Sequence, residues 1–258
     1  MIRYEKLQGV KLPAVGGPSI VVTPEGKAMG HIPGWKALID PSYLVDTGTR
    51  NRALPSNILK GLDALTYGAF GGNTAFTLPP RSRSNGPIAR FDMNPSAWTW
   101  FCVVKNEMVT PGGASYLLSP ISSIVGGILP YIVLRTAGQV SVASELPQVS
   151  TVYRVSADTA ALSGSPASLI MVTFSTSEGI KMFKNGALVA ENKADKNALT
   201  DGYQSGNLQV MPAGATRASG SLLLGLQGLL DIDLGAAENA GYRRIIERFI
   251  LAKYSITA

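Results

Sequence analysis

Apolar and polar residues alternate with a period of two in several short runs of this chain, and clusters of Gly, Pro, Asn and Asp separate the runs. Successive side chains of a β-strand point to opposite faces, so the alternation predicts strands that bury one face. It is clearest in residues 97–104, AWTWFCVV, and recurs in 131–144, 168–176 and 220–228. In the first run it separates two sets of side chains, namely Trp98, Trp100, Cys102 and Val104 against Thr99, Phe101 and Val103. The period and the turn spacing predict an all-β fold, an antiparallel sandwich of two sheets.

A hairpin is predicted within residues 172–191, VTFSTSEGIKMFKNGALVAE, where two apolar runs flank Asn185-Gly186. Asn and Gly accept the two positive φ angles of a type I′ turn, whose twist matches that of paired strands. We interpret this hairpin as a structural corner of the sandwich.

The C-terminal segment has a helical period instead. In residues 239–253 the apolar side chains recur at helical spacing, at Tyr242, Ile245, Ile246, Phe249 and Ile250. The opposite face of this predicted helix carries Arg243, Arg244, Glu247 and Arg248. A single C-terminal α-helix should therefore lie on the outside of the sandwich or cover one of its edges.

Residues 1–34 are rich in Pro and Gly and cannot build a core of their own, although they contain apolar residues. These candidate assembly contacts are Val10, Leu12, Val15, Ile20, Val21 and Val22. We expect either an extended arm that contacts a neighbouring subunit in a homo-oligomer, or an edge strand of the chain's own sandwich. The sandwich itself is expected to span residues 35–258.

Composition narrows the class of protein. Hydrophobic residues make up 45% and charged residues 16% of the chain, a balance that excludes global disorder. Cys102 is the one cysteine, so an intramolecular disulfide and a cysteine-based zinc site are excluded. The longest apolar run, residues 121–134, is short and interrupted by Gly and Pro, so membrane insertion is not expected. The single cysteine predicts folding in a reducing cytoplasm, and the first residues lack the apolar region of a signal peptide.

The net charge of +6 raises the question of an acidic partner such as nucleic acid. The basic residues are scattered and no nucleic-acid motif accompanies them, so we interpret them as a solvated face.

Catalytic and metal-binding patterns are weak. His31 is the one histidine, and no nucleophile motif accompanies it. Asp231 and Asp233 would share a face if their segment were a strand, as in glycosidases of sandwich folds, whereas Glu238 is better placed at the start of the helix. Asp92 with Asn94, and Asp195 with Asp201, offer oxygen ligands for calcium, but turn formation is the better interpretation. We expect no catalytic residue, no metal and no cofactor.

Exposed aromatic residues are the remaining candidates for carbohydrate binding, because sugars stack on Trp and Tyr rings. The candidates in predicted loops or loop edges are Trp35, Tyr43, Tyr67, Tyr116 and Tyr203. The alternative is that these rings pack beneath the sandwich, as aromatic rings commonly do.

The order of these segments resembles the concanavalin A-like (LamG-type) jelly rolls. MVTFSTSEGIKMFKNGALVAE is similar to the family's strand and hairpin, and residues 85–105, NGPIARFDMNPSAWTWFCVVK, are similar to an earlier stretch of the family. LVDTGTRNRA, residues 44–53, is similar to the loop that precedes that stretch, with Thr47 where the family has Ser. The C-terminal AENAGYRRIIERFILAKYSI is similar to the helix that ends such modules in bacteriophage virion and bacterial surface proteins.

The resemblance implies one of two functions. The first is a non-enzymatic structural protein of a bacteriophage virion, in the tail, its fibres or the capsid decoration, assembled in the host cytoplasm. It would display a lectin-like jelly roll that contacts other virion proteins or a cell-surface glycan. The alternative is a free bacterial glycan-binding module or a glycosidase of the same fold.

Overall fold

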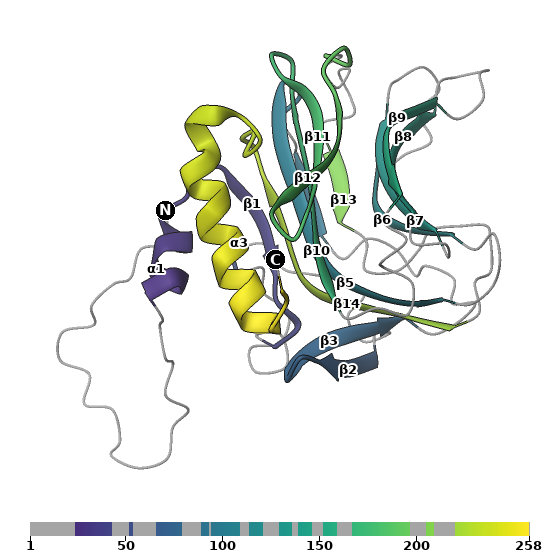
Figure 1. Ribbon diagram of the computed structural model, residues 1–258, viewed down its shortest axis with the longest axis vertical. Coiled ribbons are helices and arrows are strands. Elements are labelled where there is room, and N and C mark those ends of the chain that lie inside the picture. The colour runs from purple at the N-terminus through teal and green to yellow at the C-terminus, as the bar shows by residue number, and fades with distance from the viewer. Residues whose placement is uncertain are drawn as a thin grey trace.

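A computed structural model describes residues 24–42, 52–53, 66–78, 89–92, 94–108, 114–120, 129–135, 139–145, 152–158, 167–196, 205–208 and 220–257. Within these ranges the strands form two antiparallel sheets that face each other (Figure 1). The predicted all-β, antiparallel two-sheet jelly roll with a C-terminal helix is confirmed.

The larger sheet has the strand order β12-β11-β10-β5-β14-β3-β2, and β1 also pairs with β14. Its strands are β1 (Trp35–Ile39), β2 (Thr66–Phe70), β3 (Asn73–Leu78), β5 (Ala97–Met108), β10 (Ser168–Ser175), β11 (Gly179–Lys184), β12 (Ala187–Asn192) and β14 (Gly220–Leu230). The smaller sheet has the order β4-β13-β6-β7-β8-β9. Its strands are β4 (Ala89–Asp92), β6 (Ala114–Pro120), β7 (Leu129–Arg135), β8 (Gln139–Glu145), β9 (Val152–Asp158) and β13 (Ser205–Leu208).

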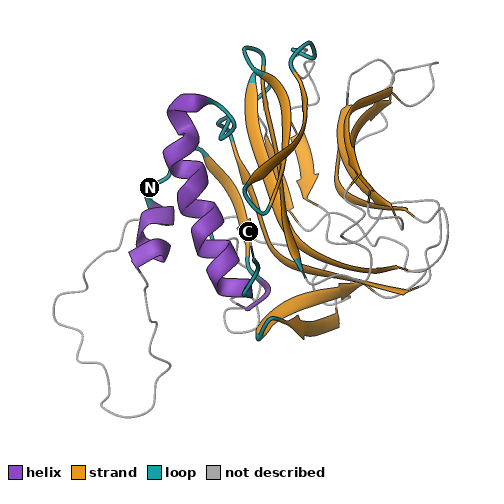
Figure 2. Cartoon of the chain, viewed as in Figure 1, coloured by secondary structure: helices purple, strands orange, loops and turns teal. Residues whose placement is uncertain are grey.

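The larger sheet is buried on both faces. Trp98 and Phe174 are cross-strand partners and stack at 5.8 Å between ring centroids on one face of this sheet. On the other face, Phe101 and Val103 belong to a core cluster with Ile246 and Ile250 of helix α3 (Ala240–Tyr254). Every residue of β10 is therefore buried, whereas the sequence pattern predicts one apolar face. The helix causes the difference, because it covers a face that would otherwise meet solvent (Figure 2).

The predicted hairpin is present. Strands β11 and β12 are antiparallel neighbours joined at Asn185 and Gly186, whose φ angles are 51° and 89°. Asn185 also ties the turn to β10, because its Oδ1 accepts a hydrogen bond from Leu169 N at 2.9 Å. Its Nδ2 donates to Thr257 O at 3.1 Å, so the turn is also held against the segment that follows α3.

Helix α3 differs in one respect from the predicted division of its faces. Ile246, Ile250 and Tyr254 are buried as the helical period requires, but Glu247 is buried with them. Tyr242, predicted on the apolar face, is 36% exposed. The helix is rotated so that Arg243 stacks over the ring of Phe183, with 4.3 Å between its Cζ and the ring centroid. A guanidinium can cover an aromatic ring while it keeps its charge. Arg243 can therefore lie against the sheet although it is basic.

Part of the predicted N-terminal arm belongs to the core. Residues 24–30 form helix α1 (Pro24–Gly30), which packs against α3. Met29 and Ile32 are 4% and 3% exposed, and the indole of Trp35 donates to Met29 O at 3.1 Å. The expectation of an extended arm or edge strand is therefore wrong for residues 24–34, because burial of these two side chains favours a compact turn of helix. The proposed assembly contacts, Val10 to Val22, lie outside the described residues.

Among the described helices, none has the length and apolar character needed to cross a membrane.

Candidate functional site

The two aspartates considered as a possible catalytic pair, Asp231 and Asp233, do not share a strand face. Strand β14 ends at Leu230, so both residues follow it in a bend. Asp231 forms an ion pair with Lys36, 2.7 Å between Oδ2 and Nζ, and accepts Asn94 N at 2.9 Å. Glu238 is exposed in a short 3-10 helix, η3 (Ala237–Asn239), at the start of α3, as predicted.

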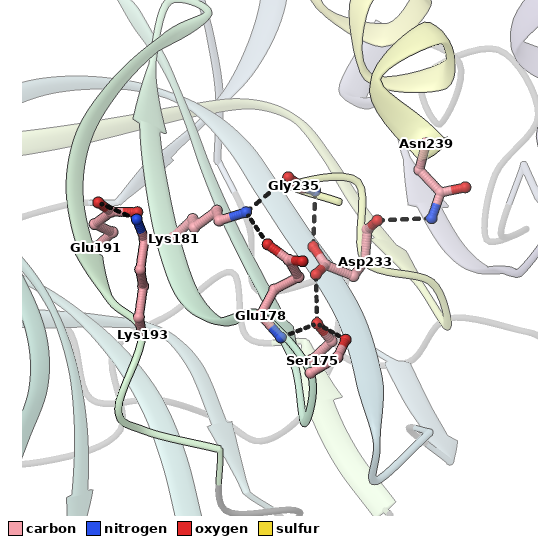
Figure 3. Close-up of polar contacts among 9 residues, drawn as sticks. Ser175, Glu178, Lys181, Glu191, Lys193, Asp233, Gly235 and Asn239 are labelled. Atoms are coloured by element: carbon pink, nitrogen blue, oxygen red, sulfur yellow. Dashed lines mark hydrogen bonds and ion pairs between the residues drawn. The ribbon is translucent and has the colours of Figure 1, made fainter. Parts of the chain in front are cut away.

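Asp233 is the centre of a polar network at this end of the sandwich (Figure 3). It is 4% exposed, and each carboxylate oxygen accepts a hydrogen bond. Oδ1 accepts Gly235 N at 2.7 Å, and Oδ2 accepts the hydroxyl of Ser175 at 2.6 Å. The Ser175 hydroxyl oxygen in turn accepts Glu178 N at 3.1 Å. A carboxylate engaged in this way closes a loop and fixes the β10–β11 connection, so its role is structural.

The network extends outward through a lysine. The ammonium of Lys181 donates to Gly235 O at 3.0 Å and to Glu178 Oε2 at 2.8 Å (Figure 3). The hydrogen bond from Lys181 lowers the pKa of Glu178. The side chain of Asn239 donates to Asp233 O at 2.8 Å, which joins the network to α3. Ser175, Lys181 and Asn239 have no sequence motif that marks this role, since they meet only after the strands pair.

The other candidate catalytic and metal-binding groups lack the partners that chemistry requires. His31 is exposed just after α1, and Cys102 is fully buried in β5, where burial raises the pKa of the thiol well above its usual range. The Oδ1 of Asn94 accepts Ser96 N at 2.9 Å, a turn contact of the kind predicted. Asp201 lies outside the described residues. In the described ranges, no group of three or more His, Cys, Asp or Glu could hold a metal.

The candidate aromatic residues are dispersed. Trp35 is half-buried, with its ring edge-on to Phe101 at 6.0 Å between centroids. Tyr67 lies on β2, is 43% exposed and contacts Phe76 at 5.5 Å between centroids. Tyr116 lies within strand β6 and not in a loop, because the run around it pairs with β7. Tyr43 and Tyr203 lie outside the described residues. Tyr67 thus stays a candidate for stacking, and Trp35 packs as the alternative interpretation predicts.

A concave cleft of about 460 Å³ lies at the end of the larger sheet opposite Asp233. Its size is within the range of small-molecule sites. Five segments form its walls: the β2–β3 turn, β5, the start of β10, the β11–β12 turn and the end of α3. The lining residues are Ala69, Phe70, Gly71, Lys105, Ala167, Ser168, Lys184, Asn185, Tyr254, Ser255, Ile256 and Thr257. We call this the Lys184 cleft.

Side-chain amides hold the walls of the Lys184 cleft together. Asn185 links the β11–β12 turn to Leu169 and Thr257, and the amide of Asn73 donates to Lys253 O at the end of α3. Gly71 has a φ of 56° and approaches Tyr254 so closely that a Cβ would lie 2.6 Å from its carbonyl oxygen. These contacts fix segments that are distant in the sequence, so the cleft has a set shape before any ligand arrives.

The charge of the cleft is one-sided. Two lysines line it and no lining residue is acidic. The ammonium of Lys105 lies 2.6 Å from Glu107 Oε1, whereas Lys184 forms no ion pair among the described residues. No sequence motif marks either lysine, since they lie almost 80 residues apart, on the two strands that flank β10 and on opposite faces of the sheet.

Comparison with solved structures identifies the class of fold to which this chain is similar. No family model and no curated protein sequence matches the chain. The binding domain of botulinum neurotoxin serotype D matches with a TM-score of 0.58 and 10% identity, over 85% of this chain and 53% of that one. The binding domain of Paraclostridial Mosquitocidal Protein 1 matches with a TM-score of 0.55 and 9% identity, over 78% of this chain and 49% of that one.

The chain therefore has a concanavalin A-like lectin jelly roll, the fold that forms the N-terminal half of the toxin binding domains. It spans about half the length of these domains. At such low identity the likeness concerns the fold, and function has to be argued from the site.

Proposed function

We propose that this chain is a non-enzymatic, lectin-like module that binds a glycan. The observation that carries the proposal is the Lys184 cleft, a preformed concavity with donors and hydroxyl groups on the fold of a lectin. The structural use of Asp231 and Asp233 supports the non-enzymatic part, because these were the best-placed acids for glycoside hydrolysis. Cleavage of a glycosidic bond requires two carboxyl groups on opposite sides of it.

The setting of the module is proposed separately. The matched toxin structures are binding domains of bacterial proteins, which favours a free bacterial binding module that recognises a cell surface. The C-terminal sequence resembles the helix that ends modules of bacteriophage virions, which favours a virion structural protein assembled in the host cytoplasm. Both settings use the same lectin-like jelly roll.

A glycan microarray tests the binding function. The purified chain should be retained on a limited set of glycans, and incubation with those glycans should release no new reducing ends. Release of reducing ends would identify a glycosidase. Retention on no glycan would contradict the proposal and leave protein contacts as the function of the fold.

Gold-labelled antibody on phage particles separates the two settings. Particles induced from the source cells should carry the label if the chain is a virion protein. Label confined to the cells or their medium would favour the free module.

We also propose that residues 1–23 mediate assembly into a homo-oligomer. A chain that begins at Pro24 retains α1 and its buried Met29, so it should keep its circular dichroism yet lose self-association in sedimentation velocity. A chain that begins at Gly34 is the control, because loss of Met29 and Ile32 should lower stability by roughly 2 kcal/mol or more. Normal assembly of the Pro24 chain would contradict the arm as an assembly element.

A further inference from the structure

We propose that a groove between helices α1 and α3 receives the N-terminal segment of a second copy of this chain. The inference rests on the proposed assembly through residues 1–23 and adds the surface that binds them. Three observations carry it: an apolar groove on the outer side of α3, the start of the N-terminal segment at the rim of that groove, and the lack of charge in the adjoining part of the segment.

The groove is a concavity of about 840 Å³ on the outer side of α3. Helix α1 packs beside α3 and forms one wall with Pro24 and Ala28 (Figure 1). The other wall comes from α3 and the residues that follow it, namely Ile245, Arg248, Leu251, Ala252, Ser255 and Ile256. We call this surface the α1–α3 groove.

The apolar side chains of the groove are only half covered. Ile245, Leu251 and Ile256 pack against the core on one side and stay partly exposed on the other. The helical period explains this position, because the buried face of α3 is already occupied by Ile246 and Ile250. A contiguous apolar surface with a polar rim is typical of a protein-binding surface.

The charge of the groove indicates the class of partner. Arg248 is exposed and is the one charged residue among the described residues of the lining. An acidic partner would find a single cation there, whereas an apolar segment can cover most of the lining. Residues 12–22, LPAVGGPSIVV, carry no charge and end in three β-branched apolar residues. They can cover the apolar wall while the guanidinium of Arg248 stays in solvent at the edge.

The length and the position of the segment also fit. Ile245 and Ala252 are about 10 Å apart along the axis of α3, and three residues of extended chain span about the same distance. Residues 20–22, Ile-Val-Val, match that length. Residues 1–23 join the described chain at Pro24, which lines the groove, so each segment starts at the rim of its own groove.

A second copy suits the groove better than the same chain does. Pro24 and Ala28 lie along one side of α1, so residues 20–22 of the same chain would have to reverse direction to lie beside them. A chain reversal takes about four residues, and Thr23 alone separates that run from Pro24. Two copies whose grooves face each other can instead exchange their segments reciprocally, which closes a dimer.

Complementation between two variants tests the inference. The first variant is the chain that begins at Pro24, which keeps the groove and lacks the segment. The second is the full chain with Ala252→Glu, which keeps the segment and places a charged side chain in the groove. Ala252 is exposed, so this substitution removes no core contact. Each variant alone should self-associate at least tenfold more weakly than the wild-type chain in sedimentation velocity. An equimolar mixture should form a one-to-one heterodimer, because the segment of the second variant fits the groove of the first.

Tyr242→Glu is the matched control, because it places the same charge at an exposed position of α3 outside the groove. This variant should self-associate as the wild-type chain does, and equal loss in Tyr242→Glu and Ala252→Glu would overturn the groove. Ala252→Arg should act as Ala252→Glu does, since a side chain that fills the groove excludes an apolar segment whichever charge it carries. Added sodium chloride should change wild-type self-association little, because the contact is apolar. Circular dichroism and thermal unfolding confirm that each variant is folded.

Other outcomes separate this inference from the assembly it rests on. If the Pro24 chain self-associates as tightly as the wild-type chain, or if the wild-type chain is monomeric, assembly through residues 1–23 is wrong and the groove is overturned with it. If the Pro24 chain loses self-association but Ala252→Glu and Ala252→Arg retain it, the assembly stands and the groove is not its acceptor. A mixture of folded variants that forms no heterodimer overturns the exchange between copies.

Discussion

Glu247 is buried although the helical period places it on the polar face of the C-terminal helix. It is 8% exposed beneath the hairpin turn, with Oε1 3.3 Å from Nε of Arg243. Burial raises the pKa of this carboxyl group, and the charges of Arg243 and Arg244 oppose the rise. The folded state therefore binds the proton of Glu247 more tightly than the unfolded state does.

This shift gives a pH-dependent prediction. The stabilisation from a raised pKa is full at low pH and is lost as pH rises through the folded-state pKa of Glu247. Glu247→Gln removes the titration, so the unfolding free energy of the variant relative to wild type should increase between pH 4 and pH 7. Urea denaturation at the two pH values measures it, with the exposed Glu238→Gln as control. A difference that does not change with pH would contradict the raised pKa.

Ser175 gives a second prediction at the residue scale. Its hydroxyl joins Asp233 to the β10–β11 connection, so Ser175→Ala leaves a buried carboxylate oxygen with one donor fewer. The variant should lose about 1–3 kcal/mol of unfolding free energy. Thr176→Ala removes an exposed hydroxyl at the same turn that does not contact the Asp233 network, and should change stability little. Equal effects of both substitutions in chemical denaturation would contradict the structural role of the Asp233 network.

At the scale of elements, the hairpin turn is the sharpest case. Gly186 has a φ of 89°, a conformation that a β-branched residue resists. Gly186→Val should lower the unfolding free energy by about 1 kcal/mol or more. Gly241→Ala is the opposite control, since a Cβ at this exposed helical position meets open space and should stabilise the helix slightly. An unchanged denaturation midpoint for Gly186→Val would count against the turn.

Long, strongly periodic elements could be predicted from the sequence. A very short helix, and the burial of a strand on both faces, could not. The runs at residues 97–104 and 168–176 became β5 and β10, and the helical period became α3. Helix α1 has seven residues including Gly26 and Gly30, too few for a period to be visible. The second buried face of β10 also escaped prediction, because alternation cannot show that a helix covers the polar side.

At the scale of the whole molecule, the site was the least predictable part. Lys105, Lys184 and Ser255 lie in different elements and carry no common motif, so they form a cleft only once the sheet is ordered and α3 is docked. Asp231 and Asp233 show the opposite error, because the sequence suggested a site that the structure does not form. Asp231 and Asp233 look like strand neighbours in the sequence, but β14 ends before them and each acid is used to fix a loop.

The central claim is that this jelly roll binds a glycan and does not cleave it. Native mass spectrometry of the chain with a glycan retained on the microarray measures both parts at once. We predict a complex whose mass is the sum of the chain and the intact glycan, unchanged through prolonged incubation. Fragments of the glycan that accumulate with time, or the absence of any complex, would contradict the claim.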